Sequence, residues 1–232
     1  METVLLIIHY IGIISFSVAG AMVAIDHETD LIGVVMLGAI TCFGGGFLRD
    51  VTAGAVIDRE VPALFTDLKI EFCVSVLMGF AVCFIAMIFK RQYVKEEETV
   101  NKINNVLDAL GIGVFTAAGT ADYLSAGAFV AITMGVLSSV GGSIIRDVML
   151  GDVPFVLRKR IYVLALLSGS LVYWLIATVI IPDREITRVV GTVACTLVVF
   201  TIRMCATYFK WNVPKAINFA ALREEMENEQ QN

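Results

Sequence analysis

The chain has 232 residues, of which 58% are hydrophobic and only 17% are charged, and its mean hydropathy is +0.83. A soluble globular domain carries about 25% charged residues, so this composition excludes that class and indicates an integral membrane protein. The formal charge of −5 arises partly from the polar tail REEMENEQQN, and the chain offers no basic groove for nucleic acid.

Seven segments are apolar and long enough to cross the membrane, since a helix needs about 20 such residues to span ~30 Å of hydrocarbon. The first run reaches Ile25 without a small-residue cleavage site behind a basic segment, so we expect a retained helix and not a signal peptide. The predicted fold is therefore an all-α membrane protein with seven transmembrane helices. In chain order the predicted spans are 3–25, 31–53, 66–89, 105–121, 125–149, 160–181 and 187–209.

The second and fifth spans contain related glycine-rich stretches, TCFGGGFLRD (41–50) and SSVGGSIIRD (138–147). Each glycine lowers helix stability by roughly 1 kcal/mol relative to alanine, which predicts a bend or break in both helices. Freed carbonyl oxygens at membrane depth must face protein or water, where they can coordinate a dehydrated monovalent cation. Close helix packing through small residues is the alternative interpretation. The predicted kink and ion-pathway residues are Gly44, Gly45, Gly46, Gly141, Gly142 and Ser143.

An arginine and an aspartate follow each glycine stretch at the same offset: Arg49 and Asp50, then Arg146 and Asp147. A charge at the bilayer centre costs several kcal/mol unless it is paired or hydrated. We therefore expect these four side chains to face a water path, where each carboxylate neutralises its arginine or the arginines form a barrier that moves on opening. Snorkelling to the headgroups is the alternative.

The two stretches belong to an internal repeat with an offset of 97 residues. Each repeat contains three spans, and because three is odd the second repeat enters the membrane from the opposite side. The halves are therefore predicted to be inverted, with the site at their interface. The predicted organisation is a first repeat at 1–89, a charged linker at 90–104, a second repeat at 105–181, a seventh helix at 182–209 and a polar tail at 210–232.

Lysine and arginine in the loops predict the orientation. With Arg49 and Arg146 left aside, the side that holds the N-terminus carries four such residues, and the other side carries eleven. The N-terminus is thus expected outside and the C-terminus in the cytoplasm, with the chain in the plasma membrane, which is the inner membrane if the source is prokaryotic. The eleven are Lys90, Arg91, Lys95, Lys102, Arg158, Lys159, Arg160, Arg203, Lys210, Lys215 and Arg223.

Residues that could carry catalysis or bind a metal are scarce. The five cysteines lie in apolar segments without a CxxC pair, and the two histidines, His9 and His27, are far apart. These patterns predict no enzyme, no metal site and no cofactor. The last span has no lysine for a retinal Schiff base, which disfavours a seven-helix photoreceptor.

The stretches GGGFLRD and GGSIIRDVMLGDVP, duplicated in a seven-span chain, resemble the prokaryotic trimeric intracellular cation (TRIC) channel family, whose repeat is also called a glycine-transporter-like domain. The resemblance covers about residues 3–209. It implies a homotrimer in which each protomer has its own hourglass pore for K⁺ and Na⁺, lined by the kinked second and fifth helices. Permeant cations and bound membrane lipid are then the expected non-protein groups. Ser143 departs from the triple glycine and is a candidate hydroxyl ligand. A secondary transporter of a small solute such as glycine is the alternative function, since inverted repeats serve both classes.

Overall fold

The computed structural model describes residues 2–57, 69–158, 161–180 and 184–211. All of the long elements in these ranges are helices. They are α1 (Glu2–Asp26), α2 (Leu31–Ile57), α4 (Lys69–Ile88), α5 (Lys90–Lys95), α6 (Glu97–Asp122), α7 (Ala128–Met149), α8 (Phe155–Arg158), α9 (Ile161–Leu175) and α10 (Arg184–Tyr208), with a 3-10 turn at Leu124–Ala126 and a π-helical turn at Ile176–Ile180. The expected start of the third span at 66–68, the edges at 160 and 181 and the tail beyond 211 lie outside the described residues.

Six of the described helices are long and apolar enough to cross a membrane: α1, α2, α4, α7, α9 with its π-helical turn, and α10. The chain is therefore an integral membrane protein built of helices. The remaining long helix, α6, has 26 residues but begins with the polar sequence EETVNKINNVLD. Because of these polar residues, α6 is not among the six helices that are apolar enough to cross a membrane. It nevertheless packs against α1, α7, α9 and α10.

Helix α6 begins at Glu97, eight residues before the span expected at 105–121, and α5 occupies much of the expected linker. The early start has a local cause. Two glutamates lie in the first turn of α6, where carboxylates interact favourably with the helix dipole, and Lys102 forms an i,i+4 ion pair with Glu98 at 2.7 Å. A hydropathy scan detects only the apolar part of such a helix, so the polar extension was missed.

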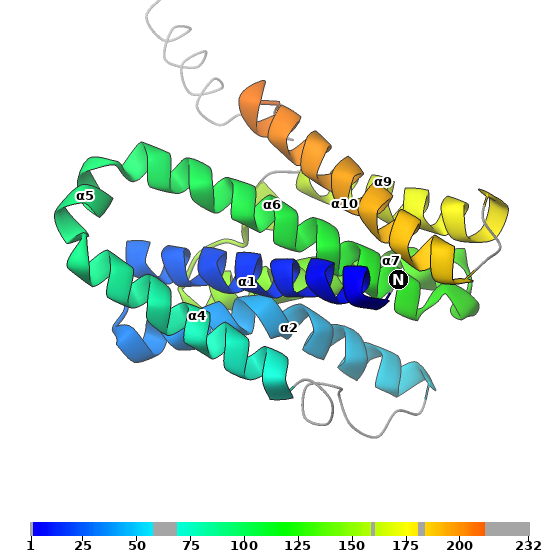
Figure 1. Ribbon diagram of the computed structural model, residues 1–232, viewed down its shortest axis with the longest axis horizontal. Helices are drawn as coiled ribbons and strands as arrows, with labels where there is room; N and C mark the ends of the chain where they lie inside the picture. The colour runs from blue at the N-terminus through cyan, green and yellow to red at the C-terminus, as the bar shows by residue number, and fades with distance from the viewer. Residues whose placement is uncertain (1, 58–68, 159–160, 181–183, 212–232) are drawn as a thin grey trace, which may run out of the picture.

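Contacts between the described helices group α1 with α2 and α4, and α6 with α7 and α9, and Figure 1 shows α1 running alongside α6. The groups meet where α1 lies along α6 and where α2 crosses α7, while α10 packs outside on α6 and α9. The groups therefore share two interfaces, and the glycine stretches lie on one of them.

The core between the groups is aromatic and aliphatic at its centre and lined with small residues at the helix contacts. Phe16 of α1 stacks on Phe115 of α6 with ring centroids 5.2 Å apart. A Cβ at Gly111 would overlap the Phe16 ring, so this glycine makes the space in which Phe16 is buried. Small residues that admit a large neighbour are typical of membrane helix packing.

Candidate functional site

The glycines of α2 and α7 lie where the two helices cross. A Cβ on Gly44 would be 3.0 Å from the Cα of Gly142, and one on Gly141 would be 2.8 Å from the Cα of Gly45. The 2.8 Å contact is shorter than real Cβ atoms show and the 3.0 Å contact is tighter than most, so the two backbones lie directly against each other. Residues earlier in α2 contact residues later in α7, and the reverse, so the two helices run antiparallel.

Two further contacts complete the crossing in the same reciprocal way. A Cβ on Gly45 would overlap the carbonyl oxygen of Ser138, and a Cβ on Gly142 would overlap that of Thr41. Thr41 and Ser138 are related by the same 97-residue offset as the glycines. Residues equivalent in the sequence repeat thus make equivalent contacts across this interface.

The expected break in these helices is wrong. Helix α2 is continuous from Leu31 to Ile57, through all three glycines, and α7 is continuous from Ala128 to Met149. The physical reason is that the missing side chains serve the contact between the backbones, and the helical hydrogen bonds need not be given up for it. A bend without a break stays a prediction.

The third position of each stretch has a different environment. A Cβ on Gly46 would meet nothing within 4 Å, so this glycine takes no part in the crossing. Its counterpart Ser143 is buried, with its hydroxyl donating to the carbonyl of Val140 at 2.9 Å. Ser143 also lines a polar cavity.

The two Arg-Asp pairs adopt the same geometry. The Nε and Nη2 groups of Arg49 both reach Oδ1 of Asp50, at 2.9 and 2.8 Å. The same two groups of Arg146 donate to Oδ1 of Asp147, at 2.9 and 2.7 Å. Each arginine is therefore neutralised by the carboxylate that follows it, as the repeat predicts.

Each pair also has an additional partner, and these differ. Arg49 donates from Nη1 to Oδ2 of Asp122, at the end of α6, at 2.9 Å. Asp147 accepts the backbone N–H of Phe155 at its Oδ2, at 2.8 Å. The first pair is thus tied to a neighbouring helix, and the second pair fixes the turn that follows α7.

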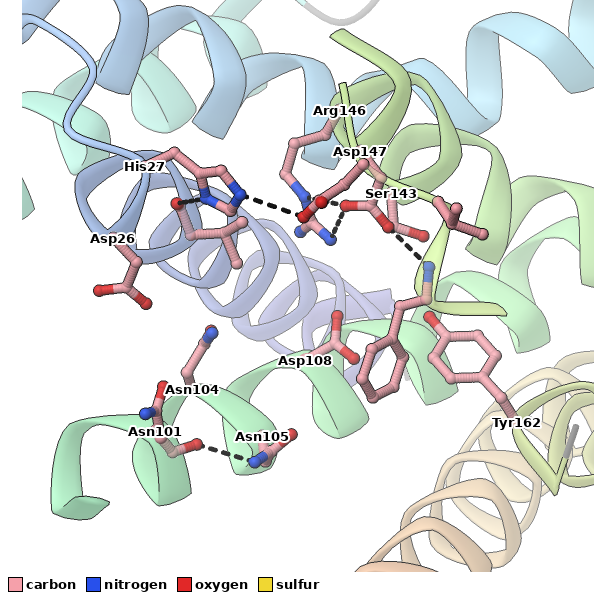
Figure 2. Close-up of a pocket in the computed structure, with 14 residues that line it drawn as sticks. Asp26, His27, Asn101, Asn104, Asn105, Asp108, Ser143, Arg146, Asp147 and Tyr162 are labelled. Carbon is pink, nitrogen blue, oxygen red and sulfur yellow. Dashed lines mark hydrogen bonds and ion pairs between the residues drawn. The ribbon is translucent and has the colours of Figure 1, made fainter. Parts of the chain in front are cut away.

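A polar cavity of about 330 Å³ opens at the end of the bundle that holds the C-terminal end of α1. We call it the inner cavity. Figure 2 shows Ser143, Arg146 and Asp147 on α7 facing residues of α6 across it, including Asp108. Among the described residues, four aspartates line this cavity together with Arg146 and His27. The four are Asp26, Asp108, Asp147 and Asp152.

His27 connects two loops at the rim of the inner cavity (Figure 2). Its Nδ1 lies 2.9 Å from the carbonyl oxygen of Val23 and its Nε2 lies 3.1 Å from Oδ2 of Asp152. Both partners are acceptors, so both nitrogens donate only when the ring is a charged imidazolium. The carbonyl of Val23 raises the pKa of His27; partial burial opposes this, and the charges of Asp152 and Asp26 add to it.

A second cavity of about 320 Å³ lies at the opposite end of α1. We call it the outer cavity. It is lined by the carboxylates Glu2 and Asp122, by Arg188, and by His9 and Tyr173. Since Asp122 holds Arg49, each cavity is bordered by one of the two motif arginines or by its direct partner.

A closed core separates the two cavities, which share no lining residue. Along α1 the separation consists of Ile13 and Phe16, which are 0% and 1% exposed. Hydroxyl groups also lie in this core: Thr120 and Ser170 both approach Gly135, and the Ser170 hydroxyl has no hydrogen-bond partner among the described residues. The core thus contains the apolar side chains of Ile13 and Phe16 from α1 and a hydroxyl group from α9.

Comparisons with known proteins agree with this geometry. The family model described as "Glycine transporter" matches residues 6–88 and 105–178. The UPF0126 membrane protein YvgT of Bacillus subtilis is 31% identical over 208 residues, which are 88% of this chain and 92% of YvgT. The TRIC channel orthologue from Rhodobacter sphaeroides superposes with a TM-score of 0.72 at 29% identity, over 90% of this chain and all of that chain. The chain belongs to the TRIC family.

A further TRIC structure, described as the structural basis for conductance through TRIC cation channels, superposes with a TM-score of 0.74 at 27% identity, over 91% of this chain and 97% of that one.

Several polar residues that line the inner and outer cavities of the present chain lie outside the duplicated motif. Asp108 pairs with Arg203 of α10 at 2.7 Å, and Asp122 pairs with Arg49. A signal for both aspartates was present in the sequence, since each is an acid inside or next to a predicted span.

Proposed function

We propose that this TRIC-family protein is a channel for monovalent cations, K⁺ and Na⁺, with a path inside each protomer. The path runs from the outer cavity to the inner cavity, past the crossing of α2 and α7. The observation that carries the proposal is the pair of polar cavities at opposite ends of one helix bundle, of which the inner one has four aspartates and one arginine among its described lining residues. An excess of one charge sign in a cleft concentrates ions of the opposite sign.

The motif residues have separate roles in this proposal. Gly44, Gly45, Gly141 and Gly142 hold the two helices together beside the path. Ser143, Arg146 and Asp147 face the inner cavity, and Arg49 with Asp50 supports the outer one. The arginines, neutralised by their aspartates, present less of a barrier to a cation than free guanidinium groups would.

The conformation described here is closed between the cavities, so conduction requires the core at Phe16 to open. The hydroxyl of Ser170, which has no hydrogen-bond partner among the described residues, marks where water and a partly dehydrated cation would find an oxygen ligand on the opposite side of that core. Buried hydroxyls without partners cost free energy, which a hydrated path relieves.

The finer architecture is also proposed. The chain has seven spans, which are the six apolar helices together with α6, the fourth span in chain order, and its halves are inverted repeats. At the glycine crossing, residues that are 97 positions apart in the sequence make equivalent contacts with the opposite helix, which supports this arrangement. The assembly is a homotrimer with bound membrane lipid, as the description of the Rhodobacter sphaeroides orthologue as trimeric supports.

The deciding experiment is a bilayer recording of the purified protein under a KCl gradient. A reversal potential close to the K⁺ equilibrium potential is expected. Current that reverses at the Cl⁻ potential would contradict the proposal. Silence in the bilayer, together with uptake of labelled glycine by proteoliposomes, would favour the transporter instead.

The position of the path is tested separately at Phe16. Phe16→Ala removes the ring that fills the space at Gly111 and should connect the two cavities, so we expect a higher open probability or conductance. Burial of Phe16 predicts a destabilisation of about 3–5 kcal/mol, so the oligomer is checked by size-exclusion chromatography. Phe80→Ala is the matched control, since Phe80 on α4 is 47% exposed. Equal currents in Phe16→Ala and Phe80→Ala would place the path elsewhere.

A further inference from the structure

A third polar cavity, of about 200 Å³, lies between the N-terminal end of α9 and the C-terminal end of α10. Its polar lining consists of Tyr162, Arg203, Thr207, Lys210 and Trp211. No carboxylate is among its described lining residues, in contrast to the inner cavity. Tyr162 borders both cavities, so one wall is shared.

Arg203 is the buried cationic group of this cavity, and it is held rigidly. It is 5% exposed, its Nη2 donates to Asp108 at 2.7 Å, and its guanidinium lies over the Tyr162 ring at 4.2 Å from the centroid. The N–H bonds of a guanidinium lie in its plane, so a ring stacked on its face does not accept them.

The Nε of Arg203 has no hydrogen-bond partner among the described residues. A buried donor on a charged group that is left unsatisfied costs more than a neutral one, and such a donor calls for an explanation in a folded protein. A ligand with acceptor oxygens in the adjacent cavity would supply the missing partner.

The remaining polar groups favour an anion for the same reason. Lys210 carries an ammonium group and Trp211 an indole N–H, which are donors only. The Thr207 hydroxyl already donates to the carbonyl of Arg203, at 2.9 Å. A phosphate group, with several charged acceptor oxygens, matches this set of donors.

The cavity lies at the depth of the lipid headgroups. Tyr208, Phe209 and Trp211, at the end of α10, are 81%, 59% and 54% exposed, and exposed aromatic residues at the end of a spanning helix mark the membrane–water interface. From these observations we infer that the cavity between α9 and α10 binds a phosphate-bearing anion, supplied by an anionic lipid headgroup or by soluble phosphate. This site is separate from the proposed cation path.

The test uses the full chain, purified in a neutral detergent. Binding is followed by native mass spectrometry and by thermal stabilisation, with three probes: dioctanoyl phosphatidylglycerol, dioctanoylglycerol, which has the same chains without phosphate, and inorganic phosphate at constant ionic strength. We expect phosphatidylglycerol or phosphate to bind and dioctanoylglycerol not to bind. Phosphatidylglycerol alone would identify a lipid headgroup as the source, and equal stabilisation by inorganic phosphate would identify a soluble ion.

Three variants distinguish binding in this cavity from nonspecific attraction of the anion to positive surface charge. Arg203→Lys keeps a cation for Asp108 but lacks the Nε donor, and Lys210→Ala removes the ammonium group. Each should weaken binding by about tenfold, as expected for one charged hydrogen bond. Lys102→Ala is the matched control, since Lys102 is an exposed lysine of α6 paired with Glu98, and it should bind as the wild type does.

Wild-type binding in both Arg203→Lys and Lys210→Ala would overturn the inference, as would equal binding of dioctanoylglycerol. If Arg203→Lys fails to give a normal size-exclusion profile, Lys210→Ala against Lys102→Ala still decides the question.

Discussion

At the scale of single residues, Asp147 has two structural roles, of which the sequence repeat predicts only the pairing with Arg146. Its Oδ1 accepts two hydrogen bonds from Arg146, and its Oδ2 accepts the backbone N–H of Phe155. One carboxylate therefore neutralises a buried cation and also fixes the chain after α7. Asp122 differs, since its side chain is 47% exposed and Arg49 has Asp50 as a second partner.

This difference predicts that replacing Asp147 or Asp122 with asparagine lowers the free energy of unfolding by unequal amounts. Asp147→Asn leaves Arg146 without its anionic partner, and breaking a buried pair typically costs about 3–5 kcal/mol. Asp122→Asn leaves Arg49 paired with Asp50, so its cost should stay within about 1 kcal/mol. Chemical unfolding of the two variants in detergent measures the comparison. Equal stability losses would mean that the pair geometry does not determine the energetics.

His27 gives the rim of the inner cavity a dependence on pH. Its pKa is raised above its ordinary value of 6.5, first by the Val23 carbonyl and then by Asp152 and Asp26, with Tyr93 and Glu97 near Asp26 on the adjoining helices. The bond to Asp152 therefore stabilises the protein fully below pH 6.5 and is lost as the pH rises through the raised pKa. The pair is partly exposed, so we expect a small effect.

His27→Gln retains a hydrogen-bonding side chain but does not titrate. Thermal unfolding of the wild type should lose more stability between pH 6 and pH 8.5 than unfolding of His27→Gln does. Parallel pH profiles for the two proteins would show that the His27–Asp152 contact is not charge-dependent.

At the scale of the elements, the crossing of α2 and α7 depends on glycines that differ in their surroundings. Gly45 and Gly142 face backbone carbonyls of the opposite helix, whereas Gly46 faces open space. A methyl group fits only where no neighbouring backbone must move. The triple glycine of α2 is thus structurally a double glycine followed by a tolerant position.

Gly45→Ala should therefore destabilise the protein by about 1–3 kcal/mol, the usual cost of overpacking. Gly46→Ala is the internal control and should be neutral or slightly stabilising, because alanine favours the helix. Thermal unfolding and size-exclusion profiles of both variants provide the measurement. A Gly46→Ala variant as unstable as Gly45→Ala would contradict the crossing geometry.

At the scale of the whole molecule, two groups of three helices share an interface and α10 packs outside both. Because consecutive spans cross the membrane in opposite directions, the side on which one loop lies determines the side of every other loop. With the N-terminus outside, α5 lies in the cytoplasm and the start of α10 lies outside.

Single cysteines at Lys95 and Arg184, in a chain whose native cysteines are replaced, test this orientation in intact cells. A membrane-impermeant maleimide should label position 184 and not position 95. Labelling at position 95 would reverse the assignment. The unsubstituted parent chain without cysteine serves as the blank.

The sequence predicts this molecule well where a pattern repeats. Six of the seven predicted spans correspond to described helices apolar enough to cross a membrane, and the membrane class and the pairing of Arg49 with Asp50 and of Arg146 with Asp147 also follow from hydropathy and spacing. The start of α6 was missed because its first turns are polar, and the break at the glycines was wrong because propensity cannot distinguish a weakened helix from a close contact. The pairs of Asp108 with Arg203 and of Asp122 with Arg49 join helices far apart in the chain, and no local pattern encodes them.

The backbone contact at the glycine crossing has a consequence for the speed of opening. A gate made of a side chain can change rotamer within picoseconds to nanoseconds. At Gly44 and Gly142, however, no side chain is present to rotate, and the chain atoms would lie about 3.0 Å from any added carbon. Any widening at this point therefore requires α2 and α7 to slide or turn as rigid rods, which takes microseconds to milliseconds. If the proposed path widens at this crossing, such motion would divide its conduction into discrete, long-lived episodes, during each of which many ions cross.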